Sequence, residues 1–263
     1  MDQKTPAPLR PAATILLLRD GAAGLEVFMV VRHHQIDFAS GALVFPGGTS
    51  DPGDQAPGLR ARADGADGLG DGNLALRVTA IREAFEECGA LFARPAGGPA
   101  LVDGGRAAEL GARYRQPLES GEIDMLAFCE AENLRLAVDQ LSPFAHWLTP
   151  VNMPKRFDTH FYLAPAPDDA GLSHDGRESV DSVWITPDQA LADAAAKRRT
   201  VIFPTRLNLE KLAQNKSVES ALAAARASPV VPVLPRVERH DGGRTLHIPL
   251  EAGYGAASFF VRE

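Results

Sequence analysis

The feature that most constrains the fold is a helix-forming segment from Leu74 to Cys88. Its apolar residues recur at helical spacing, and Gly89 stands where a helix C-cap glycine is expected. The pattern predicts a helix that ends at Cys88. The apolar residues that define the spacing are Val78, Ile81, Phe85 and Cys88.

This predicted helix carries three glutamates on one face. Glu83, Glu86 and Glu87 stand at i, i+3 and i+4, so their carboxylates lie close together. Like charges so placed destabilise a helix by roughly a few tenths of a kcal/mol per exposed pair, and a divalent cation with oxygen ligands removes that penalty. Arg82, four residues before Glu86, can orient it by a charge-assisted hydrogen bond. The alternative interpretation is a solvated acidic face.

A glycine-rich loop precedes the helix. Residues 41–48 run from a short strand into a Phe-Pro-Gly-Gly sequence, where proline ends strand pairing and the glycines allow close approach of the backbone. Residues 49–73 are rich in Gly, Asp, Ala and Pro, which predicts a flexible surface excursion.

Residues 82–90 read Arg-Glu-Ala-Phe-Glu-Glu-Cys-Gly-Ala. They match without a break the second half of the box of the Nudix hydrolase family, which is Arg-Glu-aliphatic-any-Glu-Glu-any-Gly-aliphatic. Gly48 begins the first half of that box, but Asp54 stands where the family has Glu, and a longer spacer follows. The chain therefore resembles a Nudix hydrolase.

The resemblance implies an α+β fold, a Nudix α/β/α sandwich with a mixed sheet, and hydrolysis of the diphosphate bond of nucleoside diphosphate-linked compounds. It also implies that Glu83, Glu86 and Glu87 bind Mg²⁺ or Mn²⁺, with the Gly48 carbonyl close enough to join them. Such metals polarise phosphate oxygens and orient water for in-line attack. Glu178 is a further candidate catalytic residue, as a base outside the box, and the alternative is a solvent-facing loop carboxylate.

Five residues are candidates for binding the substrate. They are Arg32, Phe45, Gly47, Gly48 and Arg82. Arg32 closes a strand beside the glycine loop, where it could either bind phosphate or form a structural salt bridge.

The segment upstream of the box resembles that of coenzyme A diphosphatases, on the strength of Arg32, Gly41 and the Phe-Pro-Gly-Gly loop. Two positions depart from that pattern: His33, and Asp37, which puts an anion where a cation is expected. Because the rest of the segment resembles coenzyme A diphosphatases, coenzyme A or acyl-coenzyme A is the leading candidate substrate. The alternatives are an ADP-ribose or NADH diphosphatase, and a non-catalytic Nudix regulator that senses a nucleotide.

We expect a disordered leader over residues 1–12, a Nudix domain over 13–215 with a helical insertion at about 106–147, and a C-terminal helix and tail extension over 216–263. Apolar runs predict strands at Ala13–Leu18, Leu25–Arg32, 157–164 and 179–185, while Thr186-Pro187-Asp188-Gln189 predicts a helix start.

Composition restricts the partners. The net charge of −7 without a run of basic residues argues against nucleic acid, and an acidic chain can still hold an anionic substrate through a bound cation. Two cysteines and the lack of a membrane-spanning apolar run predict a cytoplasmic protein. The partner that the Nudix resemblance implies is a small-molecule nucleotide. A homodimer remains an open possibility.

Overall fold

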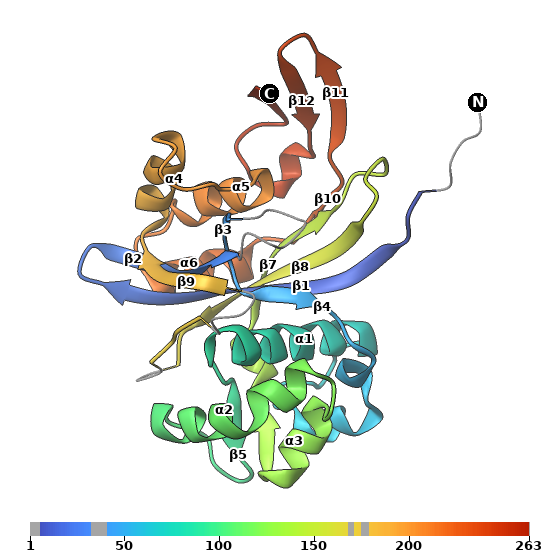
Figure 1. Ribbon diagram of the computed structural model, residues 1–263, viewed down its shortest axis with the longest axis vertical. Helices are drawn as coiled ribbons and strands as arrows, with labels where there is room; N and C mark the ends of the chain where they lie inside the picture. The colour runs from blue at the N-terminus through green and yellow to red at the C-terminus, as the bar shows by residue number, and fades with distance from the viewer. Residues whose placement is uncertain (1–5, 33–40, 168–170, 175–178, 263) are drawn as a thin grey trace.

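A mixed β-sheet with helices on both faces forms the centre of the molecule (Figure 1). The computed structural model describes residues 6–32, 41–167, 171–174 and 179–262. The helices are α1 (Asp71–Cys88), α2 (Gly104–Glu119), α3 (Met125–Ala131), α4 (Pro187–Ala195), α5 (Phe203–Leu212) and α6 (Val218–Ala227). The 3₁₀ helices are η1 (Pro52–Gln55), η2 (Pro57–Arg62), η3 (Val138–Gln140) and η4 (Leu250–Ala252).

The main sheet has eight strands in the order β10-β7-β8-β1-β2-β3, with β4 pairing β1 and β9 pairing β2. The long strand β1 is parallel to β8 and antiparallel to both β2 and β4. The strands of this sheet are β1 (Leu9–Gly21), β2 (Gly24–Arg32), β3 (Leu43–Val44), β4 (Gly47–Thr49), β7 (Ser142–Leu148), β8 (Arg156–Pro165), β9 (Ser179–Ile185) and β10 (Pro232–Val233). Two small sheets contain β5 (Ala93–Pro95) with β6 (Leu134–Leu136), and β11 (Arg236–His240) with β12 (Gly243–His247) and β13 (Ser258–Arg262).

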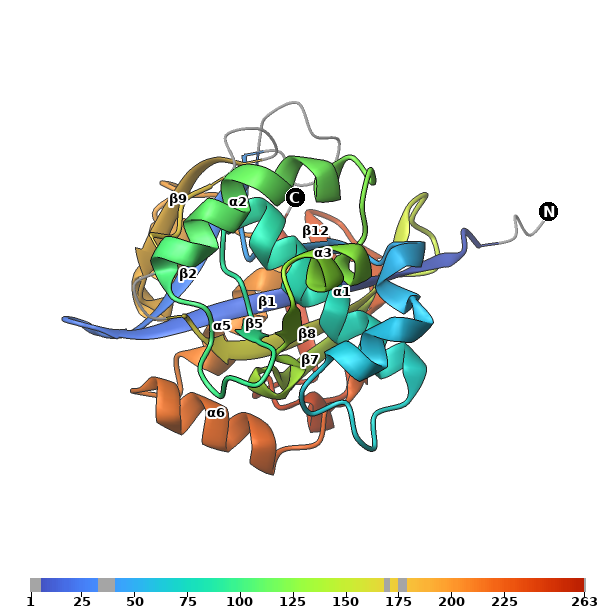
Figure 2. The same cartoon turned by 90° about the horizontal axis from the view of Figure 1, so that it is seen from below.

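Alternation along β1 divides the interior into two cores. Ile15 and Leu17 pack on the side of α1, whereas Leu16 and Leu18 pack on the side of α4 to α6. Figure 2, seen from below, shows α1, α2 and α3 gathered over one face of β1 and β8. The predicted α/β/α sandwich with a mixed sheet is confirmed.

Helix α1 is the best-predicted element. It ends at Cys88, with Gly89 in the left-handed region at φ 78°, and it begins at Asp71, three residues before the predicted start. The four residues that defined the helical spacing are all buried. The predicted start of α4 is also confirmed, since the Thr186 hydroxyl accepts from the Gln189 N–H and Pro187 stands in the first turn, although the Gln189 side chain donates to Asp193 and does not complete a capping box.

Residues 49–73 are not the flexible excursion that their composition predicts. They contain η1 and η2, which pack against α1 and α3, and they bury Asp54 and Leu59. The Pro and Gly content was misleading here because proline in a first turn also favours a 3₁₀ or helical start. The prediction was wrong because composition does not indicate which distant residues pack against this segment.

Two predicted boundaries need correction. The leader over residues 1–12 overlaps β1, which begins at Leu9. The insertion over 106–147 is helical only in α2 and α3, and its second part forms β6, η3 and most of β7. Short apolar runs in that second part fit a strand as well as a helix, and only pairing with neighbours decides between them. The division into domains stays a prediction.

The C-terminal region completes the second core rather than lying apart from it. This region contains α5 and α6, followed by a hairpin in which β11 and β12 are joined at Asp241 and Gly242. Tyr254 is buried, accepts a hydrogen bond from Trp147 Nε1 at 2.8 Å and donates one to Asn208 Oδ1 at 2.7 Å. None of the described helices is both long and apolar enough to cross a membrane.

We expect Tyr254→Phe to lower the free energy of unfolding by about 2 kcal/mol, because it leaves the Trp147 N–H and the Asn208 carbonyl oxygen buried without this partner. Urea unfolding measures the change. Tyr162→Phe, at a tyrosine of similar burial in the other core, is the matched control and should cost less. Equal losses in the two variants would show that the hydroxyl of Tyr254 does not secure the C-terminal region.

Candidate functional site

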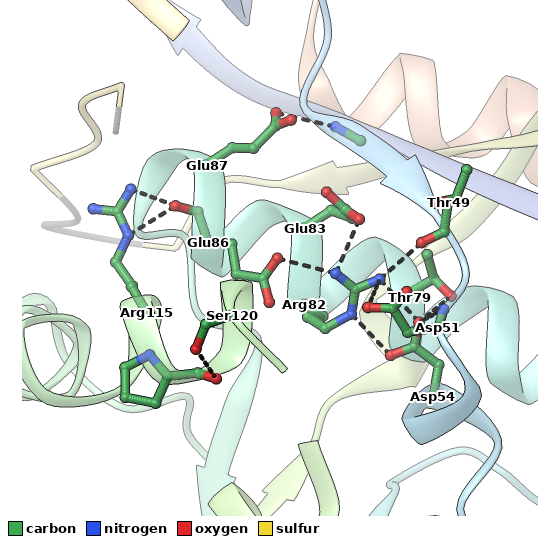
Figure 3. A network of polar contacts seen from close by, with 12 residues as sticks. Thr49, Asp51, Asp54, Thr79, Arg82, Glu83, Glu86, Glu87, Arg115 and Ser120 are labelled. Carbon is green, nitrogen blue, oxygen red and sulfur yellow. Dashed lines mark hydrogen bonds and ion pairs between the residues drawn. The ribbon is translucent and has the colours of Figure 1, made fainter. Parts of the chain in front are cut away.

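Arg82 organises the polar side of α1 (Figure 3). Its side chain is 6% exposed, and a guanidinium has five N–H donors. All five are used: two by Asp54, and one each by the Thr49 carbonyl, Glu83 and Glu86, at 2.9–3.0 Å. Arg82 orients Glu86 as expected, and because these contacts occupy all five donors they do not support its predicted role in substrate binding, which stays a prediction. It is a positioning residue.

Asp54 is the partner that keeps this arginine in place. Its Oδ1 and Oδ2 accept from Arg82 Nε and Nη2 at 3.0 Å, and Oδ2 also accepts from the Thr79 hydroxyl at 2.8 Å. Burial by itself would lower the pKa of Arg82, but its hydrogen bonds to Asp54 and the charge of Glu83 raise that pKa above its ordinary value. Asp54 therefore connects the 3₁₀ segment to α1, despite the long spacer between them.

Glu87 joins α1 to the glycine loop. Its Oε2 accepts a hydrogen bond from the Gly47 N–H at 3.2 Å. A Cβ on Gly47 would lie 2.5 Å from the Ala13 carbonyl oxygen, so no other residue fits between β1 and this carboxylate. The glycine is needed because the loop backbone approaches both the sheet and the helix.

Glu83 lies against the other glycine of the loop. A Cβ on Gly48 would be 2.5 Å from Glu83 Oε1, while the same oxygen accepts from Arg82 Nη1 at 2.9 Å. The structure thus brings Glu83, Glu86 and Glu87 to the same side of α1 as Gly47 and Gly48, as Figure 3 shows for the glutamates.

Glu86 carries the electrostatic cost of this arrangement. Burial raises its pKa from the ordinary 4.5 to about 8, although the charge of Arg82 acts in the opposite direction and that of Glu83 adds to the rise. Its Oε2 accepts from Arg82, but its buried Oε1 has no hydrogen-bond partner. A buried carboxylate oxygen without a partner, next to two further carboxylates and a backbone turn, is a donor set that fits a hard divalent cation.

Glu83 and Glu86 share Arg82 as a partner, whereas Glu87 accepts from the Gly47 N–H, and the three carboxylates do not form one tight group. Over the described ranges, one triad of His, Cys, Asp or Glu has ligand atoms all within 4.8 Å of one another, and it consists of His146, Asp158 and His160.

Arg115 is a positioning residue that no pattern in the sequence indicates. It comes from α2, and its Nε and Nη2 donate to the Glu86 carbonyl oxygen at 2.9 and 2.5 Å. The last carbonyls of a helix have no partner within it, so a cation there stabilises the end of α1. Spacing in the sequence could not reveal a contact between two helices.

The remaining predicted residues fall into two groups. Phe45 is 4% exposed and packs in the core on the side of α4 to α6, so it anchors the loop and the structure gives no support to a contact with substrate. Arg32 ends β2 with its backbone paired to Ser179, and its side chain lies outside what the structure describes. Glu178, His33 and Asp37 also lie outside the described residues.

We expect Asp54→Asn to lower the free energy of unfolding by about 3 kcal/mol, because breaking a buried ion pair leaves the Arg82 charge without its main partner. Asp51→Asn is the matched control: Asp51 lies 3.8 Å from Arg82 Nη2 with its side chain 59% exposed, and its loss should cost little. Urea unfolding of both variants tests the assignment, which would be contradicted by losses of the same size.

We expect Glu86→Gln to stabilise the metal-free protein increasingly as the pH rises from 5 to 8. The folded state keeps a proton on Glu86 up to about pH 8, whereas an unfolded glutamate loses it near 4.5, so ionisation progressively favours unfolding across this interval. Glutamine does not ionise, so the variant escapes the loss. Thermal unfolding in EDTA at pH 5, 6.5 and 8 measures the difference, and a difference that does not change with pH would count against the buried-carboxylate assignment.

Similar proteins share this architecture. A family model described as the NUDT19 Nudix domain matches residues 59–212. A crystal structure of a NUDIX hydrolase from Alicyclobacillus acidocaldarius superposes with a TM-score of 0.68 and 28% identity, covering 82% of this chain and 96% of that one.

Several curated relatives carry the name acyl-coenzyme A diphosphatase NUDT19, and two of them match most of this chain. The Xenopus laevis protein is 24% identical over 232 residues, which cover 74% of this chain and 61% of the relative. The Homo sapiens protein is 26% identical over 235 residues, which cover 75% of this chain and 63% of the relative. The chain thus spans just over three fifths of the length of these relatives. With more than half of its residues matched by the family model, the chain belongs to the Nudix family, in the group described by the NUDT19 Nudix domain.

Proposed function

We propose that this protein hydrolyses the diphosphate bond of a nucleotide-linked compound, with Mg²⁺ or Mn²⁺ held by Glu83, Glu86 and Glu87 and the Gly48 carbonyl. The observation that carries the proposal is the buried Arg82 network, which fixes two of the three carboxylates beside the glycine loop. A bound divalent cation supplies Lewis-acid polarisation of the phosphate oxygens.

The residues of the chain prepare the site for that chemistry. Arg82 holds Glu83 and Glu86 in fixed orientations, so they lose little conformational freedom when a cation and substrate bind. Glu87 holds the Gly47 N–H and keeps the loop against α1. In the reaction, the oxygen of a water forms a bond to one phosphorus, the bridging P–O bond breaks, and the proton of the water passes to a base, for which Glu178 remains the candidate.

Coenzyme A or an acyl-coenzyme A is the proposed substrate class. Support comes from the relatives named acyl-coenzyme A diphosphatase and from the Phe-Pro-Gly-Gly loop, which resembles that of coenzyme A diphosphatases. Purified protein incubated with Mg²⁺ or Mn²⁺ and coenzyme A, acetyl-coenzyme A, ADP-ribose or NADH tests it by mass spectrometry of the products. Release of phosphopantetheine or its acyl form is expected. Cleavage confined to ADP-ribose or NADH would redirect the substrate assignment, and binding without any cleavage would favour a nucleotide sensor.

We expect Glu87→Gln to reduce turnover by more than about 100-fold, because loss of even an outer partner of a metal site costs 10- to 100-fold and a ligand costs more. A neutral amide is also a poor ligand for a hard cation. Glu109→Gln is the matched control, since Glu109 lies on α2 with its side chain 69% exposed. Initial rates for both variants, with circular dichroism to check folding, measure the effect. Normal turnover of a folded Glu87→Gln protein would remove this residue from the site.

A further inference from the structure

A second cluster of ligand-type side chains lies on β7 and β8. His146 and His160 are directly paired across these antiparallel strands, and Asp158 stands two residues before His160 on the same face of β8. The side chains are only partly covered, at 15%, 27% and 33% exposed for His146, His160 and Asp158. The Nudix carboxylates play no part in this cluster.

The three side chains point their ligand atoms at one place. His146 Nε2 lies 2.5 Å and His160 Nε2 3.5 Å from the same oxygen, Asp158 Oδ1. The two imidazole rings stack with centroids 3.9 Å apart and an interplanar angle of 25°, so both present the same edge to the carboxylate. All three ligand atoms lie within 4.8 Å of one another.

This geometry is close to what a small transition-metal ion needs. With ligand bonds of about 2.0–2.1 Å, neighbouring ligand atoms around a tetrahedral zinc ion are roughly 3.3 Å apart. The distance from His160 Nε2 to Asp158 already has that size, and a small rotation of Asp158 would lengthen the shorter distance to His146. Two imidazoles and one carboxylate are typical ligands of Zn²⁺ and Co²⁺, whereas Mg²⁺ prefers oxygen ligands alone.

The cluster faces the same side of the sheet as α1. His160 is two residues from Tyr162, which packs in the core beneath α1, so both side chains lie on that face. His160 pairs with Ala13 of β1, and Ala13 pairs with Gly48 of β4. At about 4.7–4.9 Å per strand, the Cα atoms of His160 and Gly48 are roughly 10 Å apart. The two sites are neighbours on one face and share no ligand.

We propose that His146, Asp158 and His160 form a binding site for a divalent transition-metal ion of the Zn²⁺ type, separate from the carboxylate site on α1. Two imidazole nitrogens and one carboxylate oxygen supply three ligands, and the partial exposure of the cluster leaves room for water or a further ligand. This proposal does not depend on the function proposed above.

The test is binding of Zn²⁺ and Co²⁺ to the purified full chain in the presence of excess Mg²⁺. Equilibrium dialysis measures the stoichiometry and affinity for Zn²⁺, and the visible absorption of Co²⁺ reports nitrogen ligation. We expect one ion per chain under these conditions, with affinity at least about 10-fold weaker in His160→Gln and in His146→Ala because each removes one ligand. Thermal unfolding identifies any variant that has lost its fold, and His160→Gln decides the test if His146→Ala does not fold.

Two matched variants make the outcome specific. His247→Gln changes a histidine of β12 that hydrogen-bonds Glu238 and Ser258, and it should leave binding unchanged. Glu87→Gln should also leave it unchanged, although it disables the proposed catalytic site. The proposal is overturned if the chain binds neither ion, if His160→Gln binds as tightly as the wild type, or if Glu87→Gln abolishes the binding. Failure of the proposed hydrolase activity would leave this result unaffected.

Discussion

The buried guanidinium of Arg82 is the interaction on which the polar half of the structure depends. An arginine can be buried only when its charge is paired and its donors are satisfied, and here five acceptors surround it. These acceptors come from the 3₁₀ segment, from the end of β4 and from α1 itself. Asp54 supplies two of them, so the segment that carries Asp54 must fold back onto α1. The guanidinium of Arg82 therefore positions the end of the glycine-rich loop and aligns Glu83 and Glu86.

The sheet determines where this network lies. Strand β1 pairs with β4 on one side and with β8 on the other, over the same stretch of residues. Because Gly47 has no side chain, the loop after Pro46 can lie against β1 while its N–H reaches Glu87. One row of residues then runs from the glycine loop through Ala13 to His160 and His146. The sheet thus places the cluster of His146, Asp158 and His160 on the face that is covered by α1, the helix that carries the three glutamates.

Stability and chemistry oppose each other at Glu86. Its burial raises its pKa to about 8, and one of its oxygens has no protein partner. The rest of the fold must offset that cost. Apolar residues buried in two cores on opposite faces of the sheet supply the stabilising free energy. The C-terminal region contributes to the second core through Tyr254, Trp147 and Asn208. The C-terminal segment, predicted to be an extension, is therefore part of the core that supports the site.

Local patterns in the sequence determined α1, its glycine cap, the shared side of its three glutamates and the bond from Arg82 to Glu86, because each depends only on helix geometry over a few residues. The α/β/α architecture followed from the family resemblance. Tertiary structure alone decided that Asp54 pairs with Arg82 across a long spacer, that Arg115 holds the end of α1, that Phe45 is a core residue, and that His146 meets His160. These outcomes rest on contacts between residues far apart in the chain, and no periodicity or spacing encodes which distant residues become neighbours. Burial is also a property of the assembled fold, so the composition of residues 49–73 could not reveal that the Asp54 carboxylate would be buried.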